Sequence, residues 1–210
     1  MDCAICHARR PRRFCPGVKG DICTTCCGAE REVTVHCPLD CEFLQEARKH
    51  DKAPPVGDVP NLDIRVSESL LRANEKLFVF VSSALAKEAL AMPGVADFDV
   101  RAALDSLIRT YRSLQSGIYY ESLPDDPSAA NLCRAVQDAV AAFRKAETEH
   151  LGMRKTRDAD VLGLLVFLQR WEMERNNGRR LGRAFLDALR GIYPVGEEPP
   201  APPASSLILP

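Results

Sequence analysis

Apolar residues recur with a helical period through most of the chain between Leu62 and Tyr193. The clearest stripe predicts a helix that begins near Asp97 or Asp99, because aspartate is a good N-cap, and that ends before Gly117. No segment alternates apolar and polar residues for long enough to predict a sheet. One face of this helix would carry Val100, Leu104, Leu107, Ile108, Tyr111 and Leu114.

The same period predicts four further helices, over residues 67–91, 127–149 and 179–192 and from Asp158 onward. The helix from Asp158 is apolar on every face between residues 161 and 168, so we expect it to be the central, buried helix. Five helices in roughly 130 residues suffice for one core. The expected fold class is therefore mainly α, with an all-helical bundle of about five helices.

Composition divides the chain into four parts. Residues 1–50 hold nearly all of the cysteines, and residues 51–61 are rich in proline, as is typical of a linker. Residues 62–194 form the predicted helical domain. Residues 195–210 form a proline-rich tail that we expect to be disordered.

Eight of the nine cysteines lie within the first 41 residues. Two Cys-x2-Cys pairs have the spacing of zinc knuckles, and a third pair is slightly wider. Four thiolates saturate one tetrahedral zinc ion, so eight predict two zinc ions per chain. Adjacent side chains point apart, which separates Cys26 from Cys27. We therefore assign Cys3, Cys6, Cys23 and Cys26 to one zinc ion and Cys15, Cys27, Cys37 and Cys41 to the other.

Disulfides and iron–sulfur clusters are the alternatives to zinc. The chain opens with Met-Asp-Cys-Ala rather than with a secretion signal, so we expect a cytoplasmic location, where thiols stay reduced. The regular cysteine runs that hold iron–sulfur clusters are missing as well. A zinc ligand set that includes His7, His36 or His50 in place of a cysteine stays open. Bound metal would supply folding free energy that so small a core lacks.

These cysteines, together with the run Arg9-Arg-Pro-Arg-Arg13, resemble the small two-zinc cross-brace modules of the MYND and HIT type. A short helix predicted directly after Cys41 would place a ligand pair at its first turn, which resembles a treble clef. The whole layout is similar to bacterial proteins of unassigned function that carry such a module ahead of a helical domain. Because MYND and HIT modules mostly bind proteins, the resemblance implies an interaction module.

Charge bears on the choice of partner. The formal net charge is −1, and eight thiolates with two zinc ions would make the protein more acidic still, whereas a general nucleic-acid binder should be basic. We therefore expect another protein as the partner. The alternative is a zinc-stabilised nucleic-acid-binding regulator that uses the basic run of Arg9, Arg10, Arg12 and Arg13.

The helical domain offers little catalytic chemistry, and we expect no enzyme. A carboxylate di-metal bundle needs two Glu-x-x-His units and two further carboxylates, whereas only one such unit, Glu147-x-x-His150, is present. Cys133 lies on an apolar stripe, as expected for a small core residue. The five arginines between residues 170 and 183 surround an Asn-Asn-Gly turn, and we expect most of them to form salt bridges on a solvated face. No apolar run is long enough to predict a membrane span.

Overall fold

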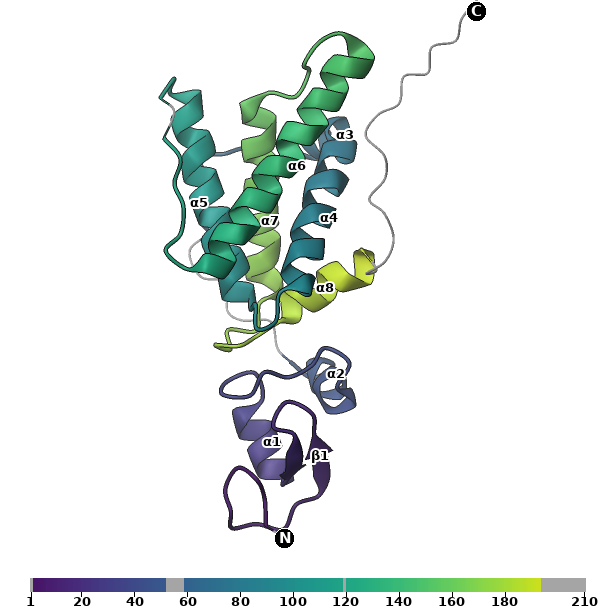
Figure 1. Ribbon diagram of the computed structural model, residues 1–210. Helices are drawn as coiled ribbons and strands as arrows, with labels where there is room; N and C mark the ends of the chain where they lie inside the picture. Colours follow the sequence, from purple (N-terminus) through teal and green to yellow (C-terminus); the bar gives the residue numbers. More distant parts are fainter. Residues whose placement is uncertain (1, 52–58, 119, 194–210) are drawn as a thin grey trace, which may run out of the picture.

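The computed structural model describes residues 2–51, 59–118 and 120–193. A small N-terminal module lies against one end of a helical bundle, where helix α8 (Ala184–Ile192) is found (Figure 1). The predicted fold class, mainly α with a small cysteine-rich module, is confirmed. The predicted tail and most of the predicted linker lie outside the described residues. Within the described residues, no helix combines the length and the apolar character needed to cross a membrane.

The module consists of a hairpin and two short helices. Strand β1 (Arg13–Cys15) pairs antiparallel with β2 (Gly20–Ile22), and Phe14 stands opposite Asp21. Helix α1 (Thr24–Glu30) follows directly, and the sulfur of Cys23 at its N-cap accepts the amide of Cys26 at 3.4 Å. Helix α2 (Glu42–Arg48) begins after Cys41, so the helix predicted there is present.

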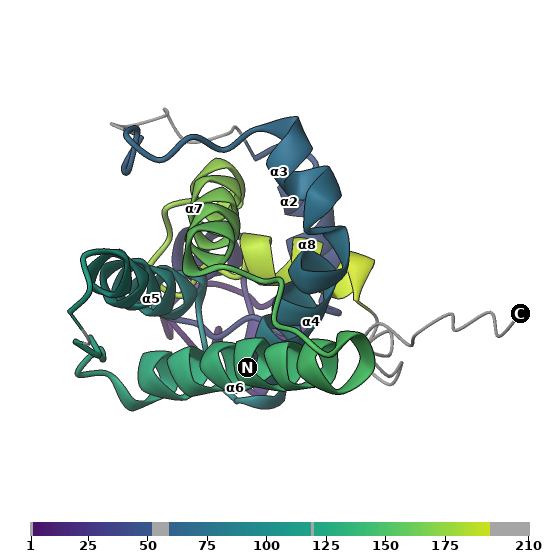
Figure 2. The same ribbon diagram turned by 90° about the horizontal axis from the view of Figure 1, so that it is seen from above.

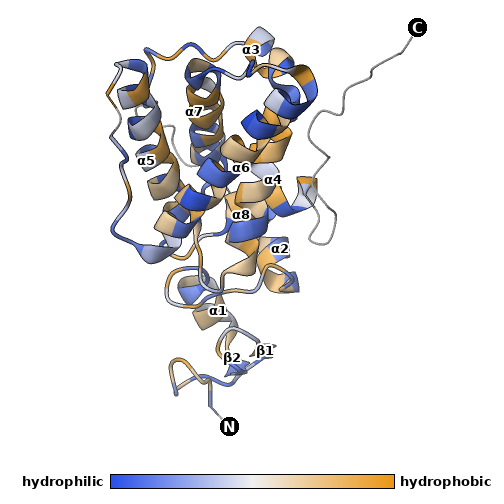
Figure 3. Ribbon diagram, turned by 45° about the horizontal axis from the view of Figure 1, so that its top comes forward, coloured by the Kyte–Doolittle hydropathy of each residue, from blue (hydrophilic) through white to orange (hydrophobic). Residues whose placement is uncertain are grey.

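The bundle is built from the remaining helices of the described residues, with α7 (Asp158–Arg175) in its interior. Seen from above, α7 is flanked by its neighbours on three sides (Figure 2). Apolar residues gather on the inward-facing sides of the helices (Figure 3). Besides α7 and α8, the bundle contains α3 (Glu68–Ala73), α4 (Glu75–Ala91), α5 (Asp97–Gln115) and α6 (Pro127–Leu151).

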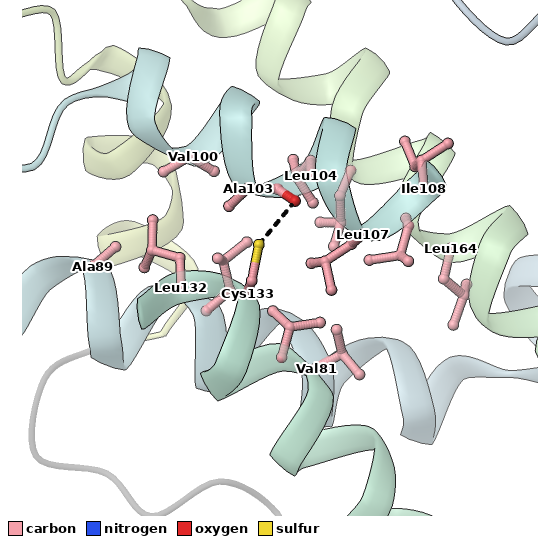
Figure 4. Close-up of a cluster of buried hydrophobic side chains, with 14 of the residues drawn as sticks. Val81, Ala89, Val100, Ala103, Leu104, Leu107, Ile108, Leu132, Cys133 and Leu164 are labelled. Atoms are coloured by element: carbon pink, nitrogen blue, oxygen red, sulfur yellow. Dashed lines mark hydrogen bonds between the residues drawn. The ribbon is translucent and has the colours of Figure 1, made fainter. Parts of the chain in front are cut away.

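The core follows the predicted stripes. Residues 161–166 of α7 are all buried, as expected for a helix that is apolar on every face. Cys133 is fully buried, and its thiol donates to the carbonyl of Ala103 at 3.4 Å (Figure 4). Burial raises the pKa of this thiol to about 11, which keeps it protonated. Cys133 is therefore part of the packing between α5 and α6.

Two predicted helix boundaries are wrong. The helix expected over residues 67–91 is broken at Asn74, whose side-chain amide donates to the carbonyl of Leu70 at 3.0 Å. The break turns α3 towards α7, where Leu70 packs on Gly163. A Cβ added at Gly163 would stand 2.4 Å from a methyl group of Leu70. The last helix begins at Ala184 instead of residue 179. Gly178, with φ +72°, leads the chain from the Asn-Asn-Gly turn into a loop, so the helix starts five residues later than predicted.

Asp97 has a role that its position at the start of α5 does not suggest. The N-cap of α5 is Ala96, so neither Asp97 nor Asp99 is the cap that the sequence predicted. The carboxylate of Asp97 instead accepts the backbone amides of Phe185 at 2.9 Å and Leu186 at 3.1 Å. It thus caps α8, 88 residues further along the chain.

Replacing Asp97 with alanine should lower the free energy of unfolding by about 2 kcal/mol at pH 5, because two amides lose their acceptor. Burial raises the pKa of Asp97 to about 7, so between about pH 4 and pH 7 the folded protein holds a proton that the unfolded chain releases. This contribution to stability therefore declines as the pH rises through that window. The loss caused by the substitution should consequently be smaller at pH 8.

Urea unfolding of the Asp97→Ala protein at pH 5 and pH 8 measures both effects. Asp138→Ala is the matched control, because Asp138 is exposed on α6 and should change stability little. Equal losses for Asp97→Ala at the two pH values would contradict the role given to the buried carboxyl.

Candidate metal centre

Four cysteines from two distant segments meet in the module. The sulfurs of Cys3, Cys6, Cys23 and Cys26 all lie within 4.8 Å of one another. Four thiolates bound to one zinc ion at about 2.3 Å stand about 3.8 Å apart, so a small contraction of this group gives a tetrahedral site. The four residues can therefore hold one metal ion. They are the set that the sequence assigned to the first zinc ion.

Backbone hydrogen bonds hold the two pairs of cysteines together. The Cys3 carbonyl accepts the amide of His7 at 2.9 Å, which closes the first knuckle. The amide of Ala4 donates to the carbonyl of Asp21 at 2.9 Å, joining that knuckle to β2. The second knuckle runs from the end of β2 into α1, and its Cys23 amide donates to the Cys3 sulfur at 3.2 Å.

The protonation of these thiols is uneven. Burial opposes ionisation of Cys3, but the amides of Cys6, Cys23 and Ile5 outweigh it and lower the pKa of Cys3 to about 6. Burial and the neighbouring sulfurs raise the pKa of Cys26 to about 12. The raised pKa of Cys26 opposes its ionisation, and a divalent metal ion bound among the four sulfurs would compensate the negative charge.

Arg9 supplies part of that positive charge. A hydrogen bond with Cys23, together with the charges of Cys6 and Cys26, raises the pKa of the Arg9 guanidinium. The first arginine of the basic run thus faces the sulfur cluster.

The second predicted set does not close into such a group, although its four members surround one space. Cys15, Cys27, Cys37 and Cys41 all line a small cavity of about 20 Å³. A Cβ at Gly17 would stand 2.6 Å from the carbonyl oxygen of His36, so only glycine lets the hairpin turn approach the segment that leads to Cys37. This close approach sets Cys15 and Cys37 on the same cavity.

Two arginines donate to the sulfur of Cys27. The distances to the Cys27 sulfur are 3.8 Å from Arg13 and 3.9 Å from Arg31. Burial raises the pKa of Cys37, while the backbone amide of Glu32, which faces that sulfur, acts in the opposite direction. Cys41 is the N-cap of α2, the place that the treble-clef resemblance implied.

The histidines that could replace a cysteine stand apart from the first group. Among the described residues, the only cluster of possible ligand atoms consists of the four cysteines, with no histidine. His7 is exposed, and His50 lies 3.6 Å from Glu46 on α2.

The basic run is divided by its contacts. Arg9 faces the first sulfur cluster, and Arg13 stacks on the ring of Phe43 at 3.8 Å while it donates to Cys27. Arg9, Arg10 and Arg12 are exposed, whereas Arg13 is partly buried. Arg13 is therefore the member of the run that is least available for an outside partner.

Two candidates in the helical domain have structural partners. Glu147 is buried, and its carboxylate accepts the amide of Thr156 at 3.0 Å and the hydroxyl of the same residue at 2.9 Å. Of the arginines expected on a solvated face, Arg170 donates to the carbonyl of Asn61 at 2.9 Å. Arg179 donates to the carbonyl of Arg31, in the module, at 3.0 Å.

The sequence did not point to Arg31 or Glu32, which the structure places beside the second set of cysteines. Arg31 follows Cys27 by four residues, a helical spacing that could have suggested the contact. Glu32 carries no such signal, because its partners lie far along the chain. Comparison with models of protein families, with curated proteins and with solved structures found no match for this chain.

Proposed function

We propose that the chain is a zinc-binding protein-interaction protein, an adaptor or regulator with no reaction of its own, that holds two zinc ions. The first ion would bind to Cys3, Cys6, Cys23 and Cys26. The second would bind to the four cysteines that line the small cavity. Zinc fits the all-sulfur ligand set and would fix the hairpin and both short helices of the module.

Three observations support the second zinc ion. The cavity that the four cysteines share has a volume of about 20 Å³, which is the space of a single small ligand. Two guanidinium groups stand beside Cys27, as outer-shell partners commonly do at thiolate sites. Cys41 sits at the first turn of α2, where a knuckle ligand belongs.

The exposure of Phe14 is the main observation that supports a protein as the partner. Its side chain stands on the outward face of β1 and is 61% exposed, although phenylalanine is normally buried. The metal-ligand candidate Cys15 follows it directly, so bound metal would hold the ring in a fixed position. Rigid, exposed aromatic residues are typical anchors of protein interfaces. The resemblance to MYND and HIT modules favours the same kind of partner.

Replacing Phe14 with alanine should therefore abolish recovery of a specific protein partner and leave the zinc content unchanged. Affinity purification after nuclease treatment, quantified by mass spectrometry, compares this variant with the unchanged chain. Phe98→Ala is the matched control, because Phe98 is an exposed aromatic residue on α5, outside the module. Partners recovered equally with both variants would argue against the hairpin as the contact surface.

Nucleic acid is the second candidate, favoured by the exposure of Arg9, Arg10 and Arg12 in the basic run. The protein-partner proposal predicts no binding to a short DNA or RNA tighter than about 100 μM at physiological salt. If the run contacts phosphates instead, affinity should fall by roughly 0.7 to 0.9 log units per tenfold salt for each phosphate. Arg10→Ala with Arg12→Ala should then reduce that slope by about two. Fluorescence anisotropy over a salt series measures both the affinity and its salt dependence. Micromolar binding that the double substitution removes would favour nucleic acid over protein as the partner.

A further inference from the structure

A buried carboxylate joins the module to the helical bundle. Glu32 is 0% exposed. One of its carboxylate oxygens accepts Arg48 at 2.7 Å and the backbone amide of Arg183 at 3.0 Å. The other accepts the side-chain amide of Asn177 at 2.8 Å. A buried charge is tolerated only when it is paired and hydrogen-bonded in this way, so the position of Glu32 must be well defined.

The main chain of the same segment also binds the bundle. The carbonyl of Glu32 accepts the amide of Leu181 at 2.8 Å, and the carbonyl of Arg31 accepts the side chain of Arg179 at 3.0 Å. The loop between α7 and α8 therefore recognises both the backbone and the side chain of one short segment of the module.

Glu32 reaches the bundle from a turn that lies between two cysteines of the second set, Cys27 and Cys37. Its φ is +53°, a left-handed conformation that glutamate adopts only when its surroundings hold it there. The carbonyl of Glu30 accepts the amides of residues 33–35 at 3.1 to 3.2 Å, which closes the turn. Arg31, the residue before it, lines the cavity that the four cysteines share. The turn thus lies beside the metal-ligand candidates and reaches the bundle through the Glu32 carboxylate.

A second connection starts at Cys41, the N-cap of α2. This helix delivers Arg48 from its last turn, where the guanidinium joins Glu32 of the module to Asp187 of α8. Figure 3 shows α2 next to α8 at this end of the bundle. Both connections therefore begin at cysteines of the second set and converge on the start of α8.

The specific contacts between the module and the bundle are hydrogen bonds and ion pairs. The apolar cluster of the module is centred on Cys3, Ile22, Cys23 and Cys26, and it shares no residue with the core of the bundle. Hydrogen bonds and ion pairs depend more strongly on geometry than apolar burial does. Docking of the module is consequently sensitive to whatever fixes Glu32 and Arg48.

We propose that metal bound by Cys15, Cys27, Cys37 and Cys41 is a latch that docks the module on the helical bundle, and that its loss releases the module from the start of α8. The proposal rests on the second zinc ion proposed above. With metal bound, the turn that carries Glu32 and the helix that carries Arg48 have a common anchor. Without it, the two connections move independently and the polar contacts open. Release would separate the hairpin with Phe14 from the bundle, so metal supply would control the geometry of the adaptor.

Hydrogen exchange of the full chain tests the latch, because the amides of Leu181 and Arg183 both donate to Glu32. Cys37→Ser should lose one zinc ion and exchange at these two amides at least about tenfold faster, the effect of losing one buried hydrogen bond. Glu32→Ala removes the carboxylate that accepts the Arg183 amide, so it should accelerate exchange of that amide to the same extent while both zinc ions stay bound. Glu46→Ala is the matched control, since Glu46 is on α2 with a side chain that is 62% exposed.

Zinc content separates the possible outcomes. The latch is supported if the unchanged chain holds two zinc ions and if exchange is accelerated in both the Cys37 and the Glu32 variants but not in the Glu46 control. Slow exchange in Cys37→Ser after the loss of one zinc ion would overturn the latch and leave the second metal centre standing. Slow exchange in Glu32→Ala would also overturn it. A single zinc ion in the unchanged chain would overturn the second metal centre and the latch together.

Discussion

Serine in place of Cys3 should remove one of two zinc ions and unfold most of the N-terminal module, and serine in place of Cys23 should do the same. Both sulfurs belong to the group whose members lie within 4.8 Å of one another. Because the module has a small apolar cluster, we expect most of its folding free energy to come from bound metal, which contributes about 10 kcal/mol or more at structural zinc sites. Elemental analysis and circular dichroism of the two variants measure the two losses.

Cys133→Ser is the matched control for these variants. Its sulfur is buried in the bundle, where the thiol donates to the Ala103 carbonyl, so the variant should keep both zinc ions. One zinc ion or none in the unchanged chain would contradict the prediction, as would iron absorption bands. If Cys3→Ser resembled Cys15→Ser instead of Cys23→Ser, the division of the cysteines between two metals would be wrong.

The sequence predicted the bundle well where an apolar stripe determines the structure. Helices α5, α6 and α7 follow from stripes of 3.6-residue period, and the burial of α7 follows from apolar residues on every face. The boundary at Asn74 did not follow, because α3 and α4 both continue the apolar period and the close packing of Leu70 on Gly163 leaves no local signal in the sequence. The start of α8 was predicted too early for a similar reason. The residues before Ala184 form a loop that contacts the module, and those contacts are distant in sequence.

The metal-ligand candidates were predictable from spacing alone, but their surroundings were not. Two Cys-x2-Cys pairs are enough to indicate Cys3, Cys6, Cys23 and Cys26 as one group. The contacts of Glu32 join residues up to 151 positions apart, and its positive φ belongs to a residue type that rarely adopts it. Asp97 is similar, because a carboxylate at the start of one helix caps another. Polar residues whose partners are distant in sequence leave no periodic signal.

A shortened chain of residues 62–194 should stay folded and helical, and a zinc chelator should leave it unaffected. It keeps the whole of the bundle's apolar cluster, and Cys133 is its only cysteine. Because it lacks Glu32, the amides of Leu181 and Arg183 would donate to water instead, and the start of α8 would become less stable. We expect a loss of about 1 to 3 kcal/mol relative to the bundle within the full chain.

Chelation of the full chain should then remove the structure of residues 2–51 and leave most of the helical signal in place. Circular dichroism during titration with a chelator, followed by thermal unfolding, should show a bundle that unfolds at the temperature of the shortened chain. The physical reason is that the two apolar clusters share no residue, so the module is joined to the bundle by polar contacts that can open without exposing the bundle's core. Collapse of the shortened chain, or loss of the α5 and α7 signal on chelation, would show instead that the module is required for the core of the bundle to fold.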